Sequence, residues 1–342
     1  MEFFRRGSST VVFRDPPSIR SSACVVGPRE GKGPLRDGFD LIHEDTLAGR
    51  TSWEKAESLM LRQSLDIALA KAGLNESQID FLLAGDLLNQ IISANFMARE
   101  FDIPFLGLYG ACSTMGEGLA IASMLVAGRF ARNVALAVSS HHDTAERQYR
   151  YPTEFAYMRT PASQWTVTAA CSTIIGAMGD GPWVEAVTPG RVQDNGITDA
   201  NDMGSAMAPA FADTVWRHLQ DMARDAPDYD LILSGDLGRV GTTIAKELLR
   251  QKSIDIEGKH RDAGLLIYED RPEIGAGGSG CACSAAVFSA VVVPSMRRGE
   301  LRRVLFVATG ALHSPTTCQQ GESIPSIAHA VSLISSLKEV RP

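Results

Sequence analysis

The 342-residue chain lacks any long run of basic residues and carries a formal net charge of -7. Its arginines cluster no more densely than in pairs such as Arg297-Arg298 and Arg302-Arg303. Because proteins bind nucleic-acid phosphates through basic faces, this pattern argues against a nucleic-acid partner. Hydrophobic residues make up 44% of the chain and charged residues 21%, a balance that excludes wholesale disorder, a collagen-like chain and a coiled coil.

The sequence also lacks a hydrophobic segment long enough to cross a bilayer. The longest uncharged window near the C-terminus, 281–296, is interrupted by serines and a proline, and it falls short of the about 20 apolar residues that a spanning helix needs. Arg5 and Arg6 are not followed by the apolar core of a signal peptide. We therefore expect an intracellular protein in which 281–296 is a buried helix.

Cysteine is scarce, with six residues in the whole chain. This is too few for the dense disulfide framework of a secreted protein, and Cys281-x-Cys283 has no second Cys/His pair to complete a zinc site. The sequence predicts reduced thiols, no metal site and no cofactor.

An internal repeat is the most informative feature that is present. The segment Asp80–Leu87, read as DFLLAGDL, returns in the second half as Asp230–Leu237, read as DLILSGDL. An apolar run closed by Gly-Asp suits a fully buried parallel strand with its carboxyl end at Asp86 or Asp236.

A second match follows in the same order. In the first half Cys112 leads into the apolar segment 118–127, and in the second half Cys283 leads into 285–296; a basic turn and an apolar strand follow each. Two matches in one order indicate a duplication of alternating strands and helices.

The repeat predicts an α/β fold of two pseudo-equivalent halves, each with a mixed five-stranded sheet. The halves would be residues 1–180 and 181–342, divided near the turn Gly179-Asp-Gly-Pro182. The apolar segments 113–127 and 284–296 have no polar face, so we expect both to be central helices buried on all sides.

Other local signals complete the expected order of elements. The spacing Thr51-Ser-Trp-Glu54 is that of a capping box and predicts a helix that runs to about Lys71 and stops at Gly73. The apolar runs 167–175 and 328–334 predict strands that return after the long loops 139–166 and 311–327. Long loops at strand ends often carry function or an interface.

These features resemble a known superfamily. The turn Gly110-Ala-Cys112-Ser before an apolar helix, together with the glycine-rich run Gly275–Gly280, is similar to the thiolase and ketoacyl synthase superfamily. The segment Cys112-Ser-Thr-Met-Gly-Glu117 and the long ending His313–Val331 resemble the stage V sporulation protein AD family over essentially the whole chain. The resemblance implies a thiolase-like duplicated fold.

The resemblance also implies a function. The expected activity is non-catalytic binding of dipicolinic acid, pyridine-2,6-dicarboxylate, for its uptake into the forespore and its release in germination. The implied partners are membrane subunits of the same sporulation operon, with the protein peripheral on the inner, forespore membrane. The superfamily usually forms homodimers through an edge strand, and the apolar stretch Pro104–Tyr109 would be that edge.

Cys112 raises the alternative of catalysis. A thiol at a helix N-terminus should have a lowered pKa, which would favour a thiol-dependent acyltransferase or condensing enzyme. However, the resemblance implies a histidine where this chain has Asp236, and a histidine or asparagine where it has the glycine run 275–280. We therefore expect no enzyme, with an acyltransferase that uses His313 or His141 as a displaced base as the alternative.

Two carboxylates are candidates for the ligand site. Asp86 and Asp236 end equivalent strands, so pseudo-two-fold symmetry would direct both towards one crevice. Each could contact the ligand, directly when protonated or through a calcium ion bound to dipicolinate, or could instead cap the following turn.

The remaining candidates surround Cys112. The N–H groups of Ser113 and Thr114 at the helix start would suit an anionic ligand, and His313 follows a glycine turn that faces the cysteine. His141 and His142 could lie on a loop or a dimer surface, whereas His329, in an apolar strand, is expected to be a core histidine.

Overall fold

The first half of the chain builds a mixed five-stranded arrangement. The computed structural model describes residues 4–149, 160–269 and 272–339. Across the sheet the order is β3 (Ser18–Val26), β9 (Ala169–Gly176), β7 (Asn133–Ser140), β5 (Phe81–Gly85) and β6 (Phe105–Gly107). The pairs β3–β9 and β9–β7 are antiparallel, and β7–β5 and β5–β6 are parallel.

The second half repeats this pattern strand for strand. Its order is β10 (Trp183–Thr188), β15 (Ser326–Ile334), β14 (Arg303–Ala311), β11 (Leu231–Ser234) and β12 (His260–Asp262). Two antiparallel pairs are again followed by two parallel pairs. The prediction of two mixed five-stranded sheets is therefore confirmed. A single residue pair between β3 and β10 joins them edge to edge.

The short strands lie at the margins of this frame. The strands β1 (Arg5–Arg6) and β2 (Thr10–Val12) pair with each other, and β2 also pairs with β10 of the second half. The strand β4 (Leu41–Ile42) lies beside β3, and β8 (Trp165–Thr166) pairs with β13 (Gly278–Ser279) in a separate ribbon. The N-terminal strands thus extend the second sheet, and the division at residue 180 stays a prediction.

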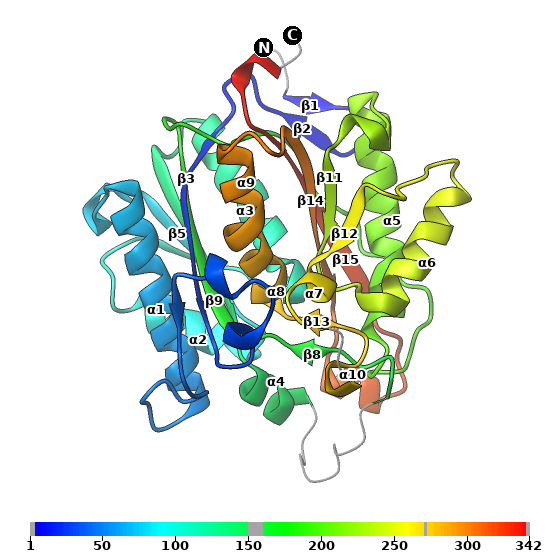
Figure 1. Ribbon diagram of the computed structural model, residues 1–342, viewed down its shortest axis with the longest axis horizontal. Coiled ribbons are helices and arrows are strands. Elements are labelled where there is room, and N and C mark those ends of the chain that lie inside the picture. The colour runs from blue at the N-terminus through cyan, green and yellow to red at the C-terminus, as the bar shows by residue number, and fades with distance from the viewer. Residues whose placement is uncertain (1–3, 150–159, 270–271, 340–342) are drawn as a thin grey trace.

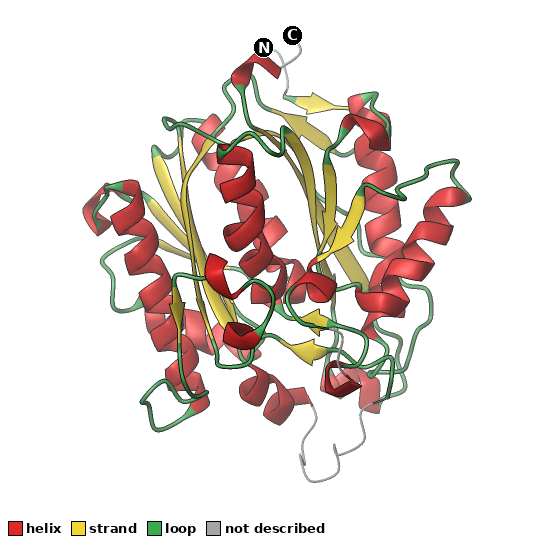
Figure 2. Ribbon diagram, viewed as in Figure 1, coloured by secondary structure: helices red, strands yellow, loops and turns green. Residues whose placement is uncertain are grey.

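Helices cover the outer faces of the two sheets (Figures 1 and 2). The helices α1 (Trp53–Ala72) and α2 (Ile92–Ala98) lie on one side, and α5 (Met203–Met222) and α6 (Gly238–Arg250) on the other. The cap of α1 is Ser52, whose hydroxyl accepts the Lys55 N–H at 3.4 Å, so the helix starts one residue later than the capping box predicts. It ends at Gly73, in the left-handed conformation with φ 64°.

The two predicted central helices are buried between the sheets. One is α3 (Thr114–Ala127), and the other consists of α8 (Cys281–Val287), a π-helical turn at Phe288–Val292, and α9 (Val293–Arg297). The residues of α8 are all buried, and α3 packs against both β7 and β14. A helix without a polar face is stable only when it is covered on all sides, as the sequence predicted.

The long loops carry short helices at the carboxyl ends of the parallel strands. The helix α4 (His142–Tyr149) follows β7, and α10 (Pro315–Gln319) follows β14; both lie at the bottom in Figure 1. The predicted strands at 167–175 and 328–334 are β9 and β15. In the three described ranges, no helix combines the length and the apolar character needed to cross a membrane.

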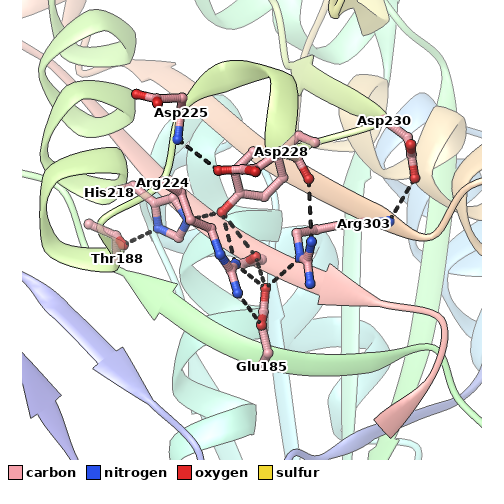
Figure 3. A network of polar contacts seen from close by, with 10 residues as sticks. Glu185, Thr188, His218, Arg224, Asp225, Asp228, Asp230 and Arg303 are labelled. Carbon is pink, nitrogen blue, oxygen red and sulfur yellow. Dashed lines mark hydrogen bonds and ion pairs between the residues drawn. The ribbon is translucent and has the colours of Figure 1, made fainter. Parts of the chain in front are cut away.

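A buried ion pair ties the second sheet to the end of α5 (Figure 3). Arg224 donates to both carboxylate oxygens of Glu185 in β10, at 2.5 and 3.0 Å, and the hydroxyl of Ser332 in β15 donates to the same carboxylate at 2.7 Å. These partners outweigh the effect of burial and hold the pKa of Glu185 below its usual value. The pair is thus satisfied on both sides, as a buried charge requires.

Candidate functional site

Cys112 lies in a tight turn against the end of β14. The turn begins at Gly110 and passes through Ala111, which adopts a left-handed φ of 51°, before α3 starts. Gly310 packs directly on it, because a Cβ at that position would lie 2.6 Å from the Gly110 carbonyl oxygen and 2.9 Å from the Ser113 nitrogen. The structure therefore brings the segment that leads to His313 against the cysteine turn.

The polar groups at the start of α3 are bonded within the turn. The Ser113 N–H and hydroxyl both donate to the Gly110 carbonyl, at 3.1 and 2.6 Å. The Thr114 N–H and hydroxyl donate to the Ala111 carbonyl, the latter at 2.6 Å. Both side chains are fully buried. The N–H groups assigned to an anionic ligand are thus already engaged, and the ligand contact of Ser113 and Thr114 stays a prediction.

The surroundings of the Cys112 thiol disfavour its ionised form. The residue is partly exposed, but burial of the sulfur raises its pKa well above the ordinary value. The nearby Asp236 raises it further, and the N–H of Gly280 opposes the shift only in part. The expectation that the helix N-terminus lowers this pKa is wrong, because desolvation and a neighbouring acid outweigh one turn of backbone dipole.

Asp236 is a buried acid without a close partner. It follows β11 in the left-handed conformation with φ 68° and has no exposed surface. Among the residues that the structure describes, neither carboxyl oxygen has a hydrogen-bond partner, although the Cys283 thiol and the Gly280 N–H lie near enough to favour its charged form. Burial and the neighbouring Asp262 raise its pKa well above the usual value, so burial favours the protonated form of this carboxyl.

The positions that the resemblance identified as acid/base sites therefore do lie beside Cys112. Asp236 raises the pKa of the thiol directly, and the N–H of Gly280, at the end of the glycine run, favours the charged form of both groups. One position holds a buried carboxyl and the other a backbone amide. Neither position supplies the histidine or asparagine that the resemblance implies for thiol chemistry.

Asp86 performs the capping role that the sequence left open. Its side chain is fully buried, and its two oxygens accept the N–H groups of Leu88 at 2.7 Å and Ala94 at 2.8 Å. Burial nevertheless raises its pKa to about 6. Behind it, Glu57 is also buried, and burial together with the charge of Asp86 raises the pKa of Glu57 to about 8. Direct ligand contact by Asp86 stays a prediction.

An aromatic group near the thiol was missed at the sequence level. The ring of Tyr149, at the end of α4, lies 5.3 Å from the ring of His313, and its hydroxyl donates to the Leu87 carbonyl at 2.5 Å. Burial raises the pKa of Tyr149, and the Cys281 and Cys112 thiols raise it further, so the ring is close to the cysteine turn. The only signal in the sequence was its position in the long loop 139–166, and that signal does not single out one residue of the loop.

Cys281 was missed as well. Its thiol donates to the Ala111 carbonyl at 3.0 Å and lies 3.8 Å from the Thr114 hydroxyl. Cys281 starts the second central helix just as the Cys112 turn starts the first, so the duplicated order was a usable signal. The contact fixes the N-termini of the two helices against each other.

Two other histidines are structural. His141 lies in the loop between β7 and α4, as one of the two alternatives predicts, but it is fully buried with Nε2 at 2.7 Å from the Thr46 carbonyl, so the expectation of a dimer surface is wrong for it. His329 accepts the Gly190 N–H at 3.2 Å, and burial lowers its pKa to about 4, which confirms a core histidine. Across the described residues, no group of three or more His, Cys, Asp or Glu side chains is arranged to hold a metal ion.

Comparison with known proteins identifies the family. The family model for stage V sporulation protein AD (SpoVAD) matches residues 7–334. Stage V sporulation protein AD of Bacillus subtilis (strain 168) is 47% identical over 325 residues, which cover 95% of this chain and 96% of that protein. The chain belongs to the stage V sporulation protein AD family. It is therefore a sporulation protein.

Solved structures of more distant proteins show the fold of this family member. OleA of Xanthomonas campestris with bound cerulenin is 14% identical, covers 95% of this chain and 100% of its own, and superposes with a TM-score of 0.62. OleA of the same organism with bound acetamide is also 14% identical, covers 95% and 100%, and gives 0.61. The predicted thiolase-like fold is confirmed; at this identity the likeness extends to the fold alone.

Proposed function

We propose that this protein binds dipicolinic acid without catalysis, for its uptake into the forespore and its release in germination. Membership of the stage V sporulation protein AD family supports the biological setting. The observation that carries the proposal is Asp236, a fully buried carboxyl where the resemblance implies a histidine, beside a thiol whose pKa burial and this acid raise. A nucleophilic cysteine needs a partner that removes its proton, and this pair does the opposite.

The surroundings of the thiol suit a flat aromatic acid. The rings of Tyr149 and His313 lie next to the Cys112 turn and could stack on a pyridine ring. The buried carboxyl of Asp236 has no hydrogen-bond partner among the described residues, and in its protonated form it would donate to a ligand carboxylate. Histidine can add positive charge opposite a dianion. These groups, with Ser113 and Thr114 in the wall, form the proposed binding site.

Asp86 supports this site from behind. Since both of its oxygens hold backbone N–H groups, it keeps the segment from Leu88 to Ala94 folded against the end of β5. A calcium ion that accompanies dipicolinate would be held mainly by the ligand's own carboxylates, and Asp236 is an acid near the site whose oxygens lack a hydrogen-bond partner among the described residues.

Calorimetric titration with dipicolinate, with and without calcium, tests ligand class and counterion together. Cys112→Ser keeps the size of the side chain, so affinity should change by no more than about 1 kcal/mol. Asp86→Arg forces a long cation into a fully buried slot and should weaken binding by several-fold to roughly a hundred-fold. Asp37→Arg, at an exposed position, is the matched control, and circular dichroism checks that each variant is folded.

The same set of proteins tests the alternative acyltransferase. After incubation with acyl-CoA, mass spectrometry would detect a thioester on Cys112 only if the thiol is a working nucleophile. A saturable thioester that Cys112→Ser abolishes, combined with dipicolinate binding that Asp86→Arg leaves intact, would establish the enzyme and overturn the binding proposal.

We propose in addition that the protein is a homodimer, peripheral on the forespore membrane beside membrane subunits of the same operon. The supporting observation for the dimer is β6, which ends the first sheet with one edge unpaired in the described chain. It presents Leu106 at 43% exposure, and Tyr109 just beyond it at 54%. An exposed apolar edge strand is stabilised when a second copy covers it.

A further inference from the structure

Two apolar side chains protrude at the end of the molecule opposite the Cys112 site. The turn 128–132, before β7, and the turn 177–182, after β9, lie side by side, because the Ala177 N–H donates to the Arg132 carbonyl at 3.0 Å. Phe130 on the first turn is 76% exposed and Met178 on the second is 79% exposed. They are the two most exposed of the large apolar side chains in the described residues. Exposed apolar side chains on adjoining segments, unlike single ones, often mark a binding surface.

A cationic cavity adjoins these turns. It has a volume of about 530 Å³ and lies where the two sheets meet, between β3 and the turn that leads into β10. Arg20, Lys71 and Arg297 line it, and Asp180 is the single carboxylate among its described lining residues. The cavity therefore has a surplus of positive charge in a protein whose net charge is negative.

Neutral oxygens satisfy two of these three cations. Arg297 donates to the carbonyl oxygens of Gly181, Ile19 and Arg20 at 3.2, 3.1 and 2.8 Å, and Arg20 donates to the Asn133 side chain at 2.9 Å. Among the described residues, neither guanidinium forms an ion pair; Lys71 pairs with Asp40 at 2.5 Å. Burial lowers the pKa of Arg297, a cost that a bound anion would offset.

Further arginines surround the protruding apolar residues. The side chains of Arg129 and Arg132 are each 87% exposed. Asp15 lies 3.9 Å from Arg129, and Asp80 lies 3.9 Å from Arg132. Exposed ion pairs of this length contribute little to stability. Both guanidinium groups can therefore reach phosphates outside the protein.

We propose that this end of the molecule docks on an anionic phospholipid bilayer, with a headgroup phosphate in the cavity of Arg20, Lys71 and Arg297. Phe130 and Met178 enter the interfacial layer beside it. A combination of basic residues and exposed apolar side chains is what peripheral binding to acidic lipid requires. The inference rests on the peripheral membrane location proposed above and names the surface that contacts the membrane.

The docking surface and the ligand site do not overlap. The docking turns lie at the start of β7, whereas the Cys112 turn, α4 and α10 lie at the carboxyl ends of the strands (Figure 1). A bilayer on this end therefore leaves the proposed ligand site uncovered. Substitutions at one end can thus test the docking surface without touching the other site.

Vesicle sedimentation tests the proposal. The full-length protein should bind phosphatidylcholine vesicles that contain about one third phosphatidylglycerol, should not bind pure phosphatidylcholine, and should lose binding as salt is raised. The double variant Phe130→Ser/Met178→Ser should weaken vesicle binding by about tenfold or more. Arg297→Gln should weaken it as well. Phe96→Ser and Arg250→Gln, which alter exposed residues elsewhere, are the matched controls and should bind like the wild type.

Inorganic phosphate separates a lipid site from a general anion site. If phosphate binds in an Arg297-dependent manner while acidic vesicles do not bind, the cavity holds free anions and the docking proposal is wrong. Equal vesicle binding by the wild type and the Phe130→Ser/Met178→Ser variant also overturns the docking proposal. So does the finding that an acidic partner protein requires these residues for binding while vesicle binding does not. Dipicolinate titration of the same variants should be unchanged; a wild type that binds vesicles but not dipicolinate would refute the ligand function alone.

Discussion

Cys112 should react with alkylating reagents more slowly than an ordinary cysteine. An unperturbed thiol with a pKa near 8.5 is about 3% ionised at pH 7, and each additional pKa unit lowers that fraction about tenfold. Burial and Asp236 raise the pKa of Cys112 well above the ordinary value. Since the thiolate is the reacting species, we expect its rate at pH 7 to be at least about tenfold below that of free cysteine.

Substitution of Asp236 separates the two causes. Asp236→Asn keeps the shape of a side chain that has no hydrogen-bond partner in the described structure, and it removes the neighbouring acid. The pKa of Cys112 should then fall, and its alkylation at a given pH should accelerate, while the contribution of burial remains. Asp236→His places a base beside the thiol and should accelerate the reaction further.

The assay is alkylation by iodoacetamide as a function of pH, with peptide mass spectrometry to follow each cysteine. Cys318, which is also partly exposed but is far less enclosed, is the internal comparison. The reasoning is refuted if Cys112 of the wild type reacts at pH 7 as fast as Cys318. It is also refuted if Asp236→Asn slows the reaction in a folded protein.

Three further predictions concern the remaining structure. Arg224→Met leaves the buried carboxylate of Glu185 with only the longer ion pair to Arg303, at 3.5 Å, and should lower the free energy of unfolding in urea by about 3 kcal/mol; the double variant with Glu185→Leu should recover much of that loss, and equal losses would contradict a coupled pair. Burial raises the pKa of Glu57 from 4.5 to about 8, so between these values the folded state keeps a proton that the unfolded state has released, and stability should fall as pH rises. Glu57→Gln should flatten this dependence in thermal melts between pH 5 and 8, and an unchanged slope would exclude Glu57 as its source. Analytical ultracentrifugation at micromolar concentration should show a dimer that Leu106→Asp dissociates, whereas a 36.8 kDa species alone in the wild type would rule the dimer out.

Much of the fold could be predicted because its signals are local. The repeat of Asp80–Leu87 at Asp230–Leu237 placed two equivalent parallel strands, and the nearly uncharged segments 113–127 and 284–296 predicted the buried central helices. Apolar periodicity reports burial directly, since a segment without a polar face has to be covered. The helix start was displaced by one residue because Thr51 and Ser52 are both good caps and the choice between them depends on backbone conformation.

The sequence by itself determined the duplicated order of elements, the position of Cys112 before a helix and the replacement of histidine by Asp236. Only the tertiary structure decided the hydrogen bonding and the ionisation of these residues. Asp86 and Asp236 end equivalent strands with the same Gly-Asp sequence, yet one accepts two backbone N–H groups and the other accepts none among the described residues. The pKa of Cys112 likewise depends on the depth of the turn and on an acid that is distant in sequence. Ionisation follows solvation and nearby charge, and both are properties of the packed molecule that a linear pattern does not contain.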